Sequence, residues 1–386
     1  LERVPPSEGA VMTAEHTDVP PDQRKEMTTT ATDLVDLRER LTEWLAAKVG
    51  RPVEVGEVNR PAEGGLSSIS LLFDATWGGA THALVARMPP DSGAFPVFPN
   101  YDLRMQYDVI SAVAAHSDVP VPELLWIEES ADALGAPFIV MRRVTGVVPT
   151  DNPPYVFFGW FFDATPAQRK TLQDRALDVL ARLHAIPNAE KTFPMLRRGD
   201  EALRAHLDAQ RAYYEWTRRQ DELRIPVIED AFAWLEANWP ADPGEPVLSW
   251  GDSRIGNMIF ADFTPVAVLD WEMAGLGPRE IDLAWYLFIH RFFQDLAELF
   301  EQPGLPDVAL RDDIVSTYEK CSGHTVRDLD WYLMYAALRY AIVMSQVKRR
   351  MIHFGEDTVP ATPDEYVMFA PTMRAMLDGT YDWTTK

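Results

Sequence analysis

Two short apolar runs in the sequence carry side chains that could handle a metal ion and phosphate groups. VLSWGDSRIGNMIF holds Asp252, Arg254 and Asn257 between segments that are apolar enough to be buried, and AVLDWE brings a second apolar run to Asp270. Carboxylate and amide oxygens are ligands that Mg²⁺ prefers, and Mg²⁺ usually takes one or two protein carboxylates together with phosphate oxygens. We therefore expect the two runs to form one site.

Phosphoryl transfer from a nucleotide to a hydroxyl group would use each of these side chains. Asp252 could orient the acceptor hydroxyl and accept its proton. Asn257 and Asp270 could hold Mg²⁺, and Arg254 could supply a cation for the phosphates. The same carboxylates could serve a metal-dependent phosphohydrolase, which differs from a kinase in passing the phosphate to water.

A glycine turn further upstream is a second candidate for phosphate contact. In GGLSSISLLF, the turn runs into a strand and could lay the backbone amides of Gly64, Gly65, Ser67 and Ser68 over phosphates. Many hairpins contain Gly-Gly, so this pattern alone is weak, and the P-loop pattern is absent. Arg87, which ends ALVARM, is either a phosphate-binding cation or an ordinary strand end.

The elements that must position these residues begin with a β-rich part. Gly78 and Gly79 form a turn signal between two strand-like segments and predict a hairpin. The predicted elements are a helix over 33–49, strands over 68–76 and 81–88, a helix over 103–115, and strands in VPVPELLWI and APFIVMRRV.

From about Gly146 onward the pattern is mostly helical. The predicted helices cover 167–186, 201–222, 227–239, 280–300, 307–320 and 329–350. The exception is the unit from Val247 to Asp270, which we interpret as a hairpin whose loop is Gly251 to Gly256. Its buried strands would hold the polar side chains rigidly at one edge.

Composition excludes several classes of protein. The 386 residues are 47% hydrophobic and 25% charged, which is typical of a globular chain. The net charge of −23 argues against a nucleic-acid partner, because such binding uses clustered Lys and Arg. The acidic balance either favours cationic substrates or only maintains solubility. The single cysteine, Cys321, excludes an internal disulfide, and we interpret it as structural or incidental.

The sequence shows no sign of export or of a membrane segment. Residues 1–30 lack hydrophobic periodicity, which predicts disorder, and they carry no signal-peptide pattern. The apolar segment from Trp331 to Val347 contains Arg339 and falls short of a membrane span, so we expect a buried helix there. These features predict a cytoplasmic protein without a membrane partner.

VLSWGDSRIGNMIF followed by AVLDWEMAGLGPREIDLAW resembles the catalytic core of the aminoglycoside phosphotransferase family. It is most similar to the mycobacterial-type branch, where Trp stands at a position usually held by His. The similarity runs from about Leu34 to the C-terminal helices. It implies an α+β, two-lobe protein-kinase-like fold, with a small β-rich N-lobe over 31–143 and a larger, mostly helical C-lobe over 144–386.

The resemblance also implies roles for the candidate residues. Asp252 matches the catalytic-loop Asp, Asn257 and Asp270 match the metal ligands, and Arg87 stands where the family usually has a phosphate-binding Lys. FIVMRRV matches the hinge, where the backbone at Met141 and Arg143 would pair with adenine. The implied reaction uses ATP or GTP with Mg²⁺ and a small-molecule hydroxyl acceptor bound between the catalytic loop and the C-terminal helices. The oligomeric state stays open.

Two departures from the family pattern raise an alternative. Trp250 replaces the usual His and cannot accept a hydrogen bond, and Gln106 stands where a Glu usually pairs with the strand cation. A nucleotide-binding pseudokinase is therefore a second hypothesis. Retention of Asp252 favours an active enzyme, since a pure binder does not need that carboxylate.

The remaining polar and aromatic residues near these motifs have alternative interpretations. Glu272 either adds a metal or substrate contact or forms a salt bridge, whereas His184 and Asp282 are expected to be structural. The aromatic run YVFFGWFF either packs in the core or forms an apolar wall for the acceptor. The family name suggests aminoglycosides, but membership does not transmit a substrate.

Overall fold

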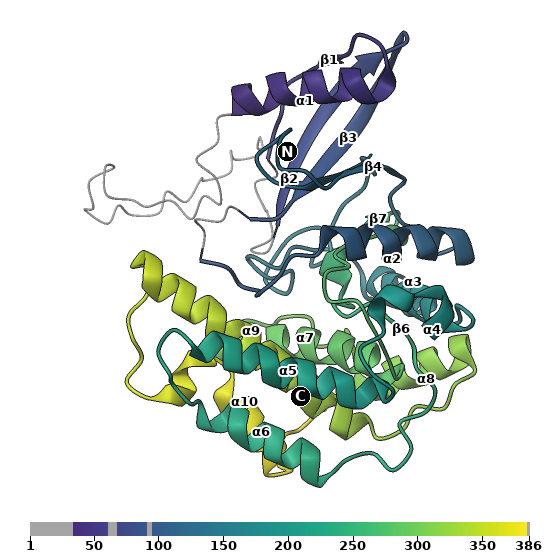
Figure 1. Ribbon diagram of the computed structural model, residues 1–386. Helices are drawn as coiled ribbons and strands as arrows, with labels where there is room; N and C mark the ends of the chain where they lie inside the picture. Colours follow the sequence, from purple (N-terminus) through teal and green to yellow (C-terminus); the bar gives the residue numbers. More distant parts are fainter. Residues whose placement is uncertain (1–33, 61–67, 91–94, 384–386) are drawn as a thin grey trace, which may run out of the picture.

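The computed structural model describes residues 34–60, 68–90 and 95–383. Within these ranges a small part, made of one helix over a β-sheet, lies above a larger part built mostly of helices (Figure 1). The predicted disordered segment, 1–30, lies outside the described residues, as do Gly64, Gly65 and Ser67.

The sheet of the small part is antiparallel and has the order β1-β2-β3-β5-β4. Gly78 and Gly79 have φ of 60° and 81°, so both adopt the left-handed conformation that a two-residue hairpin turn requires, and the predicted hairpin is confirmed. The elements are α1 (Leu34–Val49), β1 (Glu54–Val55), β2 (Ile69–Trp77), β3 (Ala80–Met88), β4 (Leu124–Glu128) and β5 (Phe138–Arg142).

Helix α2 (Leu103–His116) joins the two parts. Asp102 caps it by accepting a hydrogen bond from the backbone N–H of Met105, at 2.8 Å. Its buried face carries Val109, Ile110 and Val113, which belong to the large core of the helical part. The helix is therefore packed on the larger part while it contacts the sheet at β4 and β5.

The helical part follows the predicted order of helices. Helix α3 begins with a capping box in which the Thr165 and Gln168 side chains exchange hydrogen bonds with each other's backbone N–H, and α9 ends at Gly355 with φ of 74°. The helices are α3 (Pro166–His184), α4 (Ala189–Thr192), α5 (Ala202–Arg218), α6 (Pro226–Ala237), α7 (Glu280–Leu299), α8 (Arg311–Ser322), α9 (Leu329–Phe354) and α10 (Ala370–Leu377), with short 3₁₀ turns η2 (Pro194–Leu196), η3 (Ile255–Asn257) and η4 (Pro363–Tyr366).

The strands around the candidate site pair differently from the prediction. β6 (Val247–Ser249) pairs with β9 (Gly275–Gly277), whereas β7 (Met258–Ala261) pairs with β8 (Thr264–Val268). The hairpin turn falls at Asp262 and Phe263, whose φ values are 47° and 57°. The predicted hairpin with a loop at 251–256 is therefore wrong, because that segment connects two separate small sheets.

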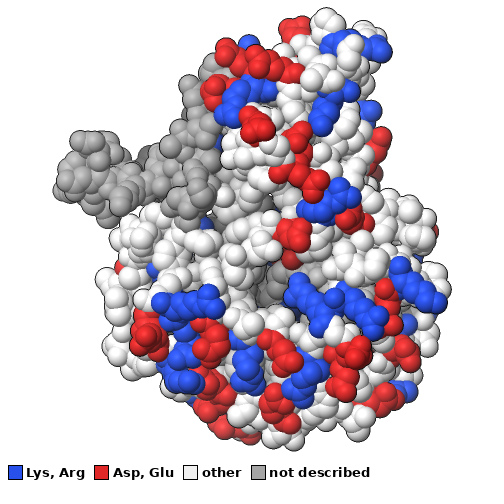
Figure 2. All heavy atoms as spheres, in the orientation of Figure 1, with Lys and Arg blue, Asp and Glu red and all other residues white. Residues whose placement is uncertain are grey.

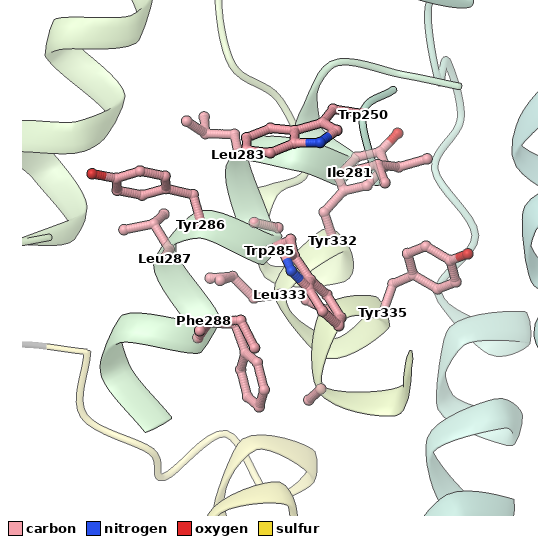
Figure 3. Packing of buried hydrophobic residues seen from close by; sticks show 14 of the residues in the cluster. Trp250, Ile281, Leu283, Trp285, Tyr286, Leu287, Phe288, Tyr332, Leu333 and Tyr335 are labelled. Carbon is pink, nitrogen blue, oxygen red and sulfur yellow. The ribbon is translucent and has the colours of Figure 1, made fainter. Parts of the chain in front are cut away.

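The core of the helical part supports the candidate site from below. Trp250 and Trp271 are among the largest fully buried side chains, and they belong to one cluster with the apolar faces of α7 and α9. Figure 3 shows Trp250 close to Leu283 of α7 and Trp285 beside Leu333 of α9. Close-packed interiors of this kind hold side chains in fixed rotamers. The loop segments next to Trp250 and Trp271 are therefore firmly anchored where they leave the core.

Helix α9 confirms the prediction of a buried helix over the apolar segment 331–347. Arg339 in its middle is 2% exposed and lies inside the protein. Among the residues that the structure describes, no helix is long and apolar enough to cross a membrane.

The aromatic run serves mainly as core packing. Tyr155 and Phe161 are buried, and the Tyr155 ring packs edge-to-face on Phe161 and Phe293. The Tyr155 hydroxyl lies 2.9 Å from Nδ1 of His290, which is 5% exposed. The run is absent from the lining of the cavity of about 360 Å³ described below, but Tyr155 lies beside Arg254 in a smaller pocket, so a role as an acceptor wall stays a prediction.

His290 predicts a loss of stability in mild acid. Burial, with a smaller contribution from the positive charge of Arg291, lowers the pKa of His290 to about 4, below its ordinary value of 6.5. The unfolded chain therefore takes up a proton that the folded chain refuses, and stability falls as the pH drops from about 6.5 toward 4. Between pH 7 and pH 5 this group should remove about 2 kcal/mol from the free energy of unfolding.

Urea denaturation at the two pH values checks this expectation. His290→Gln should show a smaller loss between pH 7 and pH 5 than the wild type, by about 2 kcal/mol. The exposed His116 provides the control, and His116→Gln should behave as the wild type. An unchanged loss in His290→Gln would contradict a buried neutral imidazole.

Candidate active site

The two predicted runs meet and are joined by hydrogen bonds. The backbone N–H of Leu269, next to Asp270, donates to the carbonyl of Asn257 at 2.9 Å. The indole N–H of Trp250 donates to the carbonyl of Leu269 at 2.8 Å. Asp252, Asn257 and Asp270 therefore lie in one framework, as the sequence predicted. Trp250 braces this framework as a hydrogen-bond donor, so this contact needs no acceptor at position 250.

Backbone conformation in the loop leaves no space for side chains at two positions. Gly251 has φ of 91°, and a Cβ there would collide with the Met273 carbonyl. A Cβ on Gly256 would collide with the carboxylate of Asp151. The loop that carries Asp252 is thus held tightly between the segment after Asp270 and the residue Asp151.

Asp282, at the start of α7, holds the loop from the inside. Its carboxylate accepts hydrogen bonds from the Ser249 hydroxyl at 2.8 Å and from the backbone N–H groups of Trp250 and Gly251 at 2.7 and 2.9 Å. It also lies 3.0 Å from Nε2 of His184. Burial alone would raise the pKa of Asp282, but the bonds from His184, Gly251 and Ser249 outweigh burial and lower it. The structural roles expected for both side chains are confirmed.

Replacement of Asp282 by Asn should destabilise the protein. The amide would turn an NH₂ group toward donors that now bind a buried carboxylate, and the expected cost is about 2–4 kcal/mol in the free energy of unfolding. Chemical denaturation measures this cost. Asp330→Asn is the matched control, because the Asp330 side chain is 74% exposed and should cost under about 0.5 kcal/mol. Equal stabilities for the two variants would contradict the bracing role.

The carboxylate of Asp252 is oriented by two donors on the same oxygen. Oδ1 accepts from Nε of Arg254 at 2.9 Å and from the indole N–H of Trp285 at 2.7 Å. This arrangement leaves Oδ2 as the oxygen that can face an acceptor hydroxyl. Trp285 follows Asp282 by three residues on α7, so helical periodicity could have placed it on the same face.

Arg254 is engaged with two carboxylates. In addition to Asp252, its guanidinium contacts the carboxylate of Asp151. Burial would lower the pKa of Arg254, but the charges of Asp252 and Asp151 outweigh burial and raise it. Arg254 therefore fixes the carboxylate of Asp252, and its contact with phosphates stays a prediction. Nothing in the sequence indicated that Asp151 belongs to the site, because it lies in a loop about a hundred residues upstream of Arg254.

The donor set at Asn257 and Asp270 fits Mg²⁺ that arrives with a nucleotide. The Asn257 amide nitrogen donates to the carbonyl of Asp252 at 3.1 Å, which leaves its oxygen as the outward acceptor. Within the described ranges, no group of three or more His, Cys, Asp or Glu side chains could hold a metal ion by itself. Mg²⁺ needs only one or two protein carboxylates when phosphates complete its shell. One carboxylate and one amide oxygen satisfy that requirement.

Arg87 lies against the predicted metal-binding carboxylate. Its Nη2 contacts Asp270 and lies 3.9 Å from Oε2 of Glu272. Burial lowers the pKa of Arg87, and the charge of Glu272 opposes this effect. Within the described residues no hydrogen bond joins Arg87 to Gln106. Glu272 is therefore an acidic partner of Arg87, a role that the neutral Gln106 cannot fill. This contact confirms the salt-bridge interpretation of Glu272.

Three of the remaining predicted nucleotide-binding residues, Ser68, Met141 and Arg143, lie in the part of the chain that the structure describes. Ser68 lies immediately before β2 and is half-buried. Met141 is paired on both sides within the sheet, and the backbone N–H of Arg143 donates to Ala83 at 3.0 Å, while its side chain bonds to Asp74 at 2.5 Å. An adenine contact at Met141 and Arg143 stays a prediction, and the sheet already uses the N–H of Arg143.

A cavity of about 360 Å³ opens beside the loop. On the face drawn in Figure 2 the molecule is hollowed between its upper and lower parts, and basic side chains lie along the lower edge of this hollow. Two lining residues contact Gly251: Arg339 donates to its carbonyl at 2.9 Å, and Met273 packs against it. The cavity is lined from α2, α5, α9, the segment around η2 and the segment 272–276.

Comparisons with known proteins agree on a fold and a family. The family model described as "Phosphotransferase enzyme family" matches residues 73–310. Among solved structures, a Ralstonia eutropha protein described as an aminoglycoside phosphotransferase superposes with a TM-score of 0.62 at 20% identity, over 89% of this chain and 97% of that one. Macrolide 2′-phosphotransferase MphH of Brachybacterium faecium gives a TM-score of 0.53 at 20% identity, over 86% and 97%.

The curated relatives that match this chain are much longer proteins. "Acyl-CoA dehydrogenase family member 11" of Gallus gallus is 27% identical over 280 residues, which cover 70% of this chain and 34% of the relative. "Acyl-CoA dehydrogenase family member 10" of Mus musculus is 26% identical over 293 residues, covering 71% and 25%. The chain thus spans about a third or less of these relatives.

Proposed function

Because the chain belongs to the phosphotransferase enzyme family and has its α+β, kinase-like fold, we propose that it transfers the γ-phosphate of ATP to a hydroxyl group of a small molecule. The observation that carries this proposal is the joining of Asp252, Asn257 and Asp270 into one hydrogen-bonded framework. A catalytic carboxylate, an amide and a metal-binding carboxylate are the parts that phosphoryl transfer requires.

Asp252 would position the acceptor and take its proton. Arg254 and Trp285 hold one carboxylate oxygen, so the other is presented in a fixed direction. A hydroxyl that donates to this oxygen is oriented for attack, and its proton moves to the carboxylate as the new P–O bond forms. The framework fixes the base before the acceptor arrives, which lowers the entropic cost of the reaction.

Asn257 and Asp270 would hold Mg²⁺ against the nucleotide. When bound, the metal neutralises charge on the phosphates. Arg87, in contact with Asp270 and opposite Glu272, would add a fixed cation next to the same phosphates. Cations that are already oriented stabilise charge that develops on the transferred group without further reorganisation.

The names of the curated relatives suggest an acceptor class. A segment similar to this chain accounts for about a third of proteins named as acyl-CoA dehydrogenase family members. We therefore propose a hydroxylated acyl compound as the acceptor, in preference to the aminoglycoside that the family name suggests. A solved neighbour that binds hygromycin B, APH(4)-Ia, is only 15% identical and supports the fold alone.

A panel of acceptors tests this proposal. The protein is incubated with Mg²⁺ and ATP, or GTP, and with hydroxylated acyl compounds or aminoglycosides, and mass spectrometry detects the mass of one added phosphoryl group. Phosphorylated hydroxyacyl products would support the proposal. Phosphorylated aminoglycosides alone would overturn the acceptor class. Inorganic phosphate as the only product would favour a phosphohydrolase, and failure to bind ATP or GTP would contradict the phosphotransferase.

A further inference from the structure

One guanidinium in the cavity wall has no acidic partner. Arg339, on α9, is 2% exposed, and among the described residues no carboxylate forms an ion pair with it. Its Nη2 donates to the carbonyl of Gly251 at 2.9 Å, whereas Nε and Nη1 have no hydrogen-bond partner within the described chain. Buried arginines are normally paired with an acid, so two unused donors at the edge of a cavity require an explanation.

Aromatic rings compensate Arg339 only in part. The guanidinium carbon lies 4.5 Å from the ring centroid of Trp285 and 5.6 Å from that of Tyr335. Such cation–π contacts stabilise the charge, but they leave the in-plane N–H donors without an acceptor. Each of these donors is suited to an oxygen of a carboxylate or a phosphate, and the second N–H of Nη2 can complete a parallel pair with one of them.

The surroundings of Arg339 favour an anion. Burial, followed by the positive charges of Arg339 and Arg198, lowers the pKa of His206 to about 4, so this imidazole is neutral at pH 7. The acidic lining residues are engaged or peripheral: Glu272 faces Arg87, Asp102 caps α2, and Glu190 is exposed. The cavity lining therefore places the positive charges of Arg339 and Arg198 beside a neutral imidazole, although the whole chain is acidic.

The rest of the lining combines polar and apolar side chains. The apolar ones include Phe98, Met105, Leu196, Ala205, Leu276 and Val343. A ligand with a hydrocarbon part and one anionic group would bury the first against these side chains and pair the second with the guanidinium.

We propose that the cavity binds the acceptor through an anionic group, a carboxylate or a phosphate, that pairs with Arg339. Arg339 contacts Gly251, the residue that precedes Asp252 in the catalytic loop. This inference rests on the proposed function and makes it more specific, because it excludes aminoglycoside-like cations as the preferred acceptors. Arg339 is thereby a specificity-determining residue. Its contact with Gly251 places the anion close to Asp252, so binding and positioning of the acceptor are coupled.

Equilibrium binding tests the inference without requiring transfer. Calorimetry without nucleotide compares alkyl carboxylates, alkyl phosphates, primary alcohols and alkylamines of equal chain length. The wild type should bind one of the two anions at least about tenfold more tightly than the alcohol, and the amine most weakly. A preference for the carboxylate indicates a free acid as the natural ligand, and a preference for the phosphate indicates a phosphate-bearing carrier.

The Arg339→Gln variant separates recognition from structure. It should weaken anion binding about 10- to 100-fold and leave alcohol binding unchanged, because only the anion uses the charge. Arg339→Lys should retain part of the preference, and Arg224→Gln, at a 65% exposed side chain, should retain all of it. Equal weakening for anion and alcohol would show a structural role and overturn the inference. A wild type that prefers the amine would overturn it even if Arg339→Gln fails to fold.

Failure of this inference and failure of the proposed function give different results. A protein that transfers phosphate from ATP but binds amines more tightly than anions keeps the function and loses the inference. A protein that binds anions through Arg339 but neither binds nor uses a nucleotide keeps the anion site and loses the function.

Discussion

Replacement of Asp252 by Asn is expected to lower kcat for phosphoryl transfer about 10²- to 10⁴-fold while affinity for Mg²⁺–ATP stays within about twofold of the wild type. The amide keeps the shape of the carboxylate and can still accept the bond from Trp285, so the loop should remain in place. It cannot take the proton of the acceptor hydroxyl. The effect should therefore appear in kcat and leave nucleotide binding intact.

Steady-state kinetics and nucleotide titration of the purified variant measure this separation. Asp118→Asn is the matched control, because the Asp118 side chain is 81% exposed and should leave both parameters unchanged. A variant at 252 that keeps kcat within about threefold of the wild type would contradict the assignment of Asp252 as the base.

Replacement of Asp270 by Asn should abolish the Mg²⁺ dependence of ATP binding. The carboxylate is the charged protein ligand of the proposed metal site, and Asn257 offers only a neutral oxygen. Loss of a charged contact worth about 2–3 kcal/mol weakens binding about 100-fold. Calorimetric titration of ATP with and without Mg²⁺ measures this change.

The titration without metal provides the internal control for Asp270→Asn. ATP alone should bind the variant at least as well as the wild type, because removal of the carboxylate releases Arg87, which now contacts Asp270. If Mg²⁺ strengthens ATP binding equally in both proteins, the metal does not bind at Asp270. The assignment of Asn257 as its partner would then fail as well.

Local patterns predicted much of the fold. The Gly78–Gly79 hairpin, the helical periodicity and the buried helix around Arg339 are short-range features, and the structure confirms each of them. The structural role expected for Asp282 is also confirmed, although its carboxylate binds a loop about thirty residues upstream. The two-lobe, kinase-like fold is likewise shown. The lobe boundaries near 143 and the mycobacterial-type branch stay predictions.

Pairings between distant segments could not be predicted. Val247–Ser249 pairs with Gly275–Gly277 across about thirty residues, and the intervening β7–β8 hairpin has its own turn at Asp262. Two apolar strands flanking a polar loop look the same in sequence whether they pair with each other or with other partners. Periodicity gives the face of a strand, and the neighbour is decided by packing of the whole chain.

The partners of charged side chains were the least predictable feature of the site. Nothing in the sequence indicated that Arg254 pairs with Asp252 and Asp151. Arg339 appeared only as an interruption of an apolar segment, and the structure places it in the wall of the cavity. The sequence does not show which partner a charged side chain faces, so the role of that side chain follows only from the three-dimensional arrangement.

The fate of the γ-phosphate tests the central claim most directly. Phosphorus NMR follows the phosphate signals of ATP in a reaction that contains Mg²⁺, a hydroxylated acyl acceptor and either the wild type or Asp252→Asn. We expect the γ-phosphate signal to be replaced by that of a phosphate monoester on the acceptor, with the wild type and not with the variant. Release of inorganic phosphate alone, at a rate that is the same in both proteins, would contradict a phosphotransferase that uses Asp252.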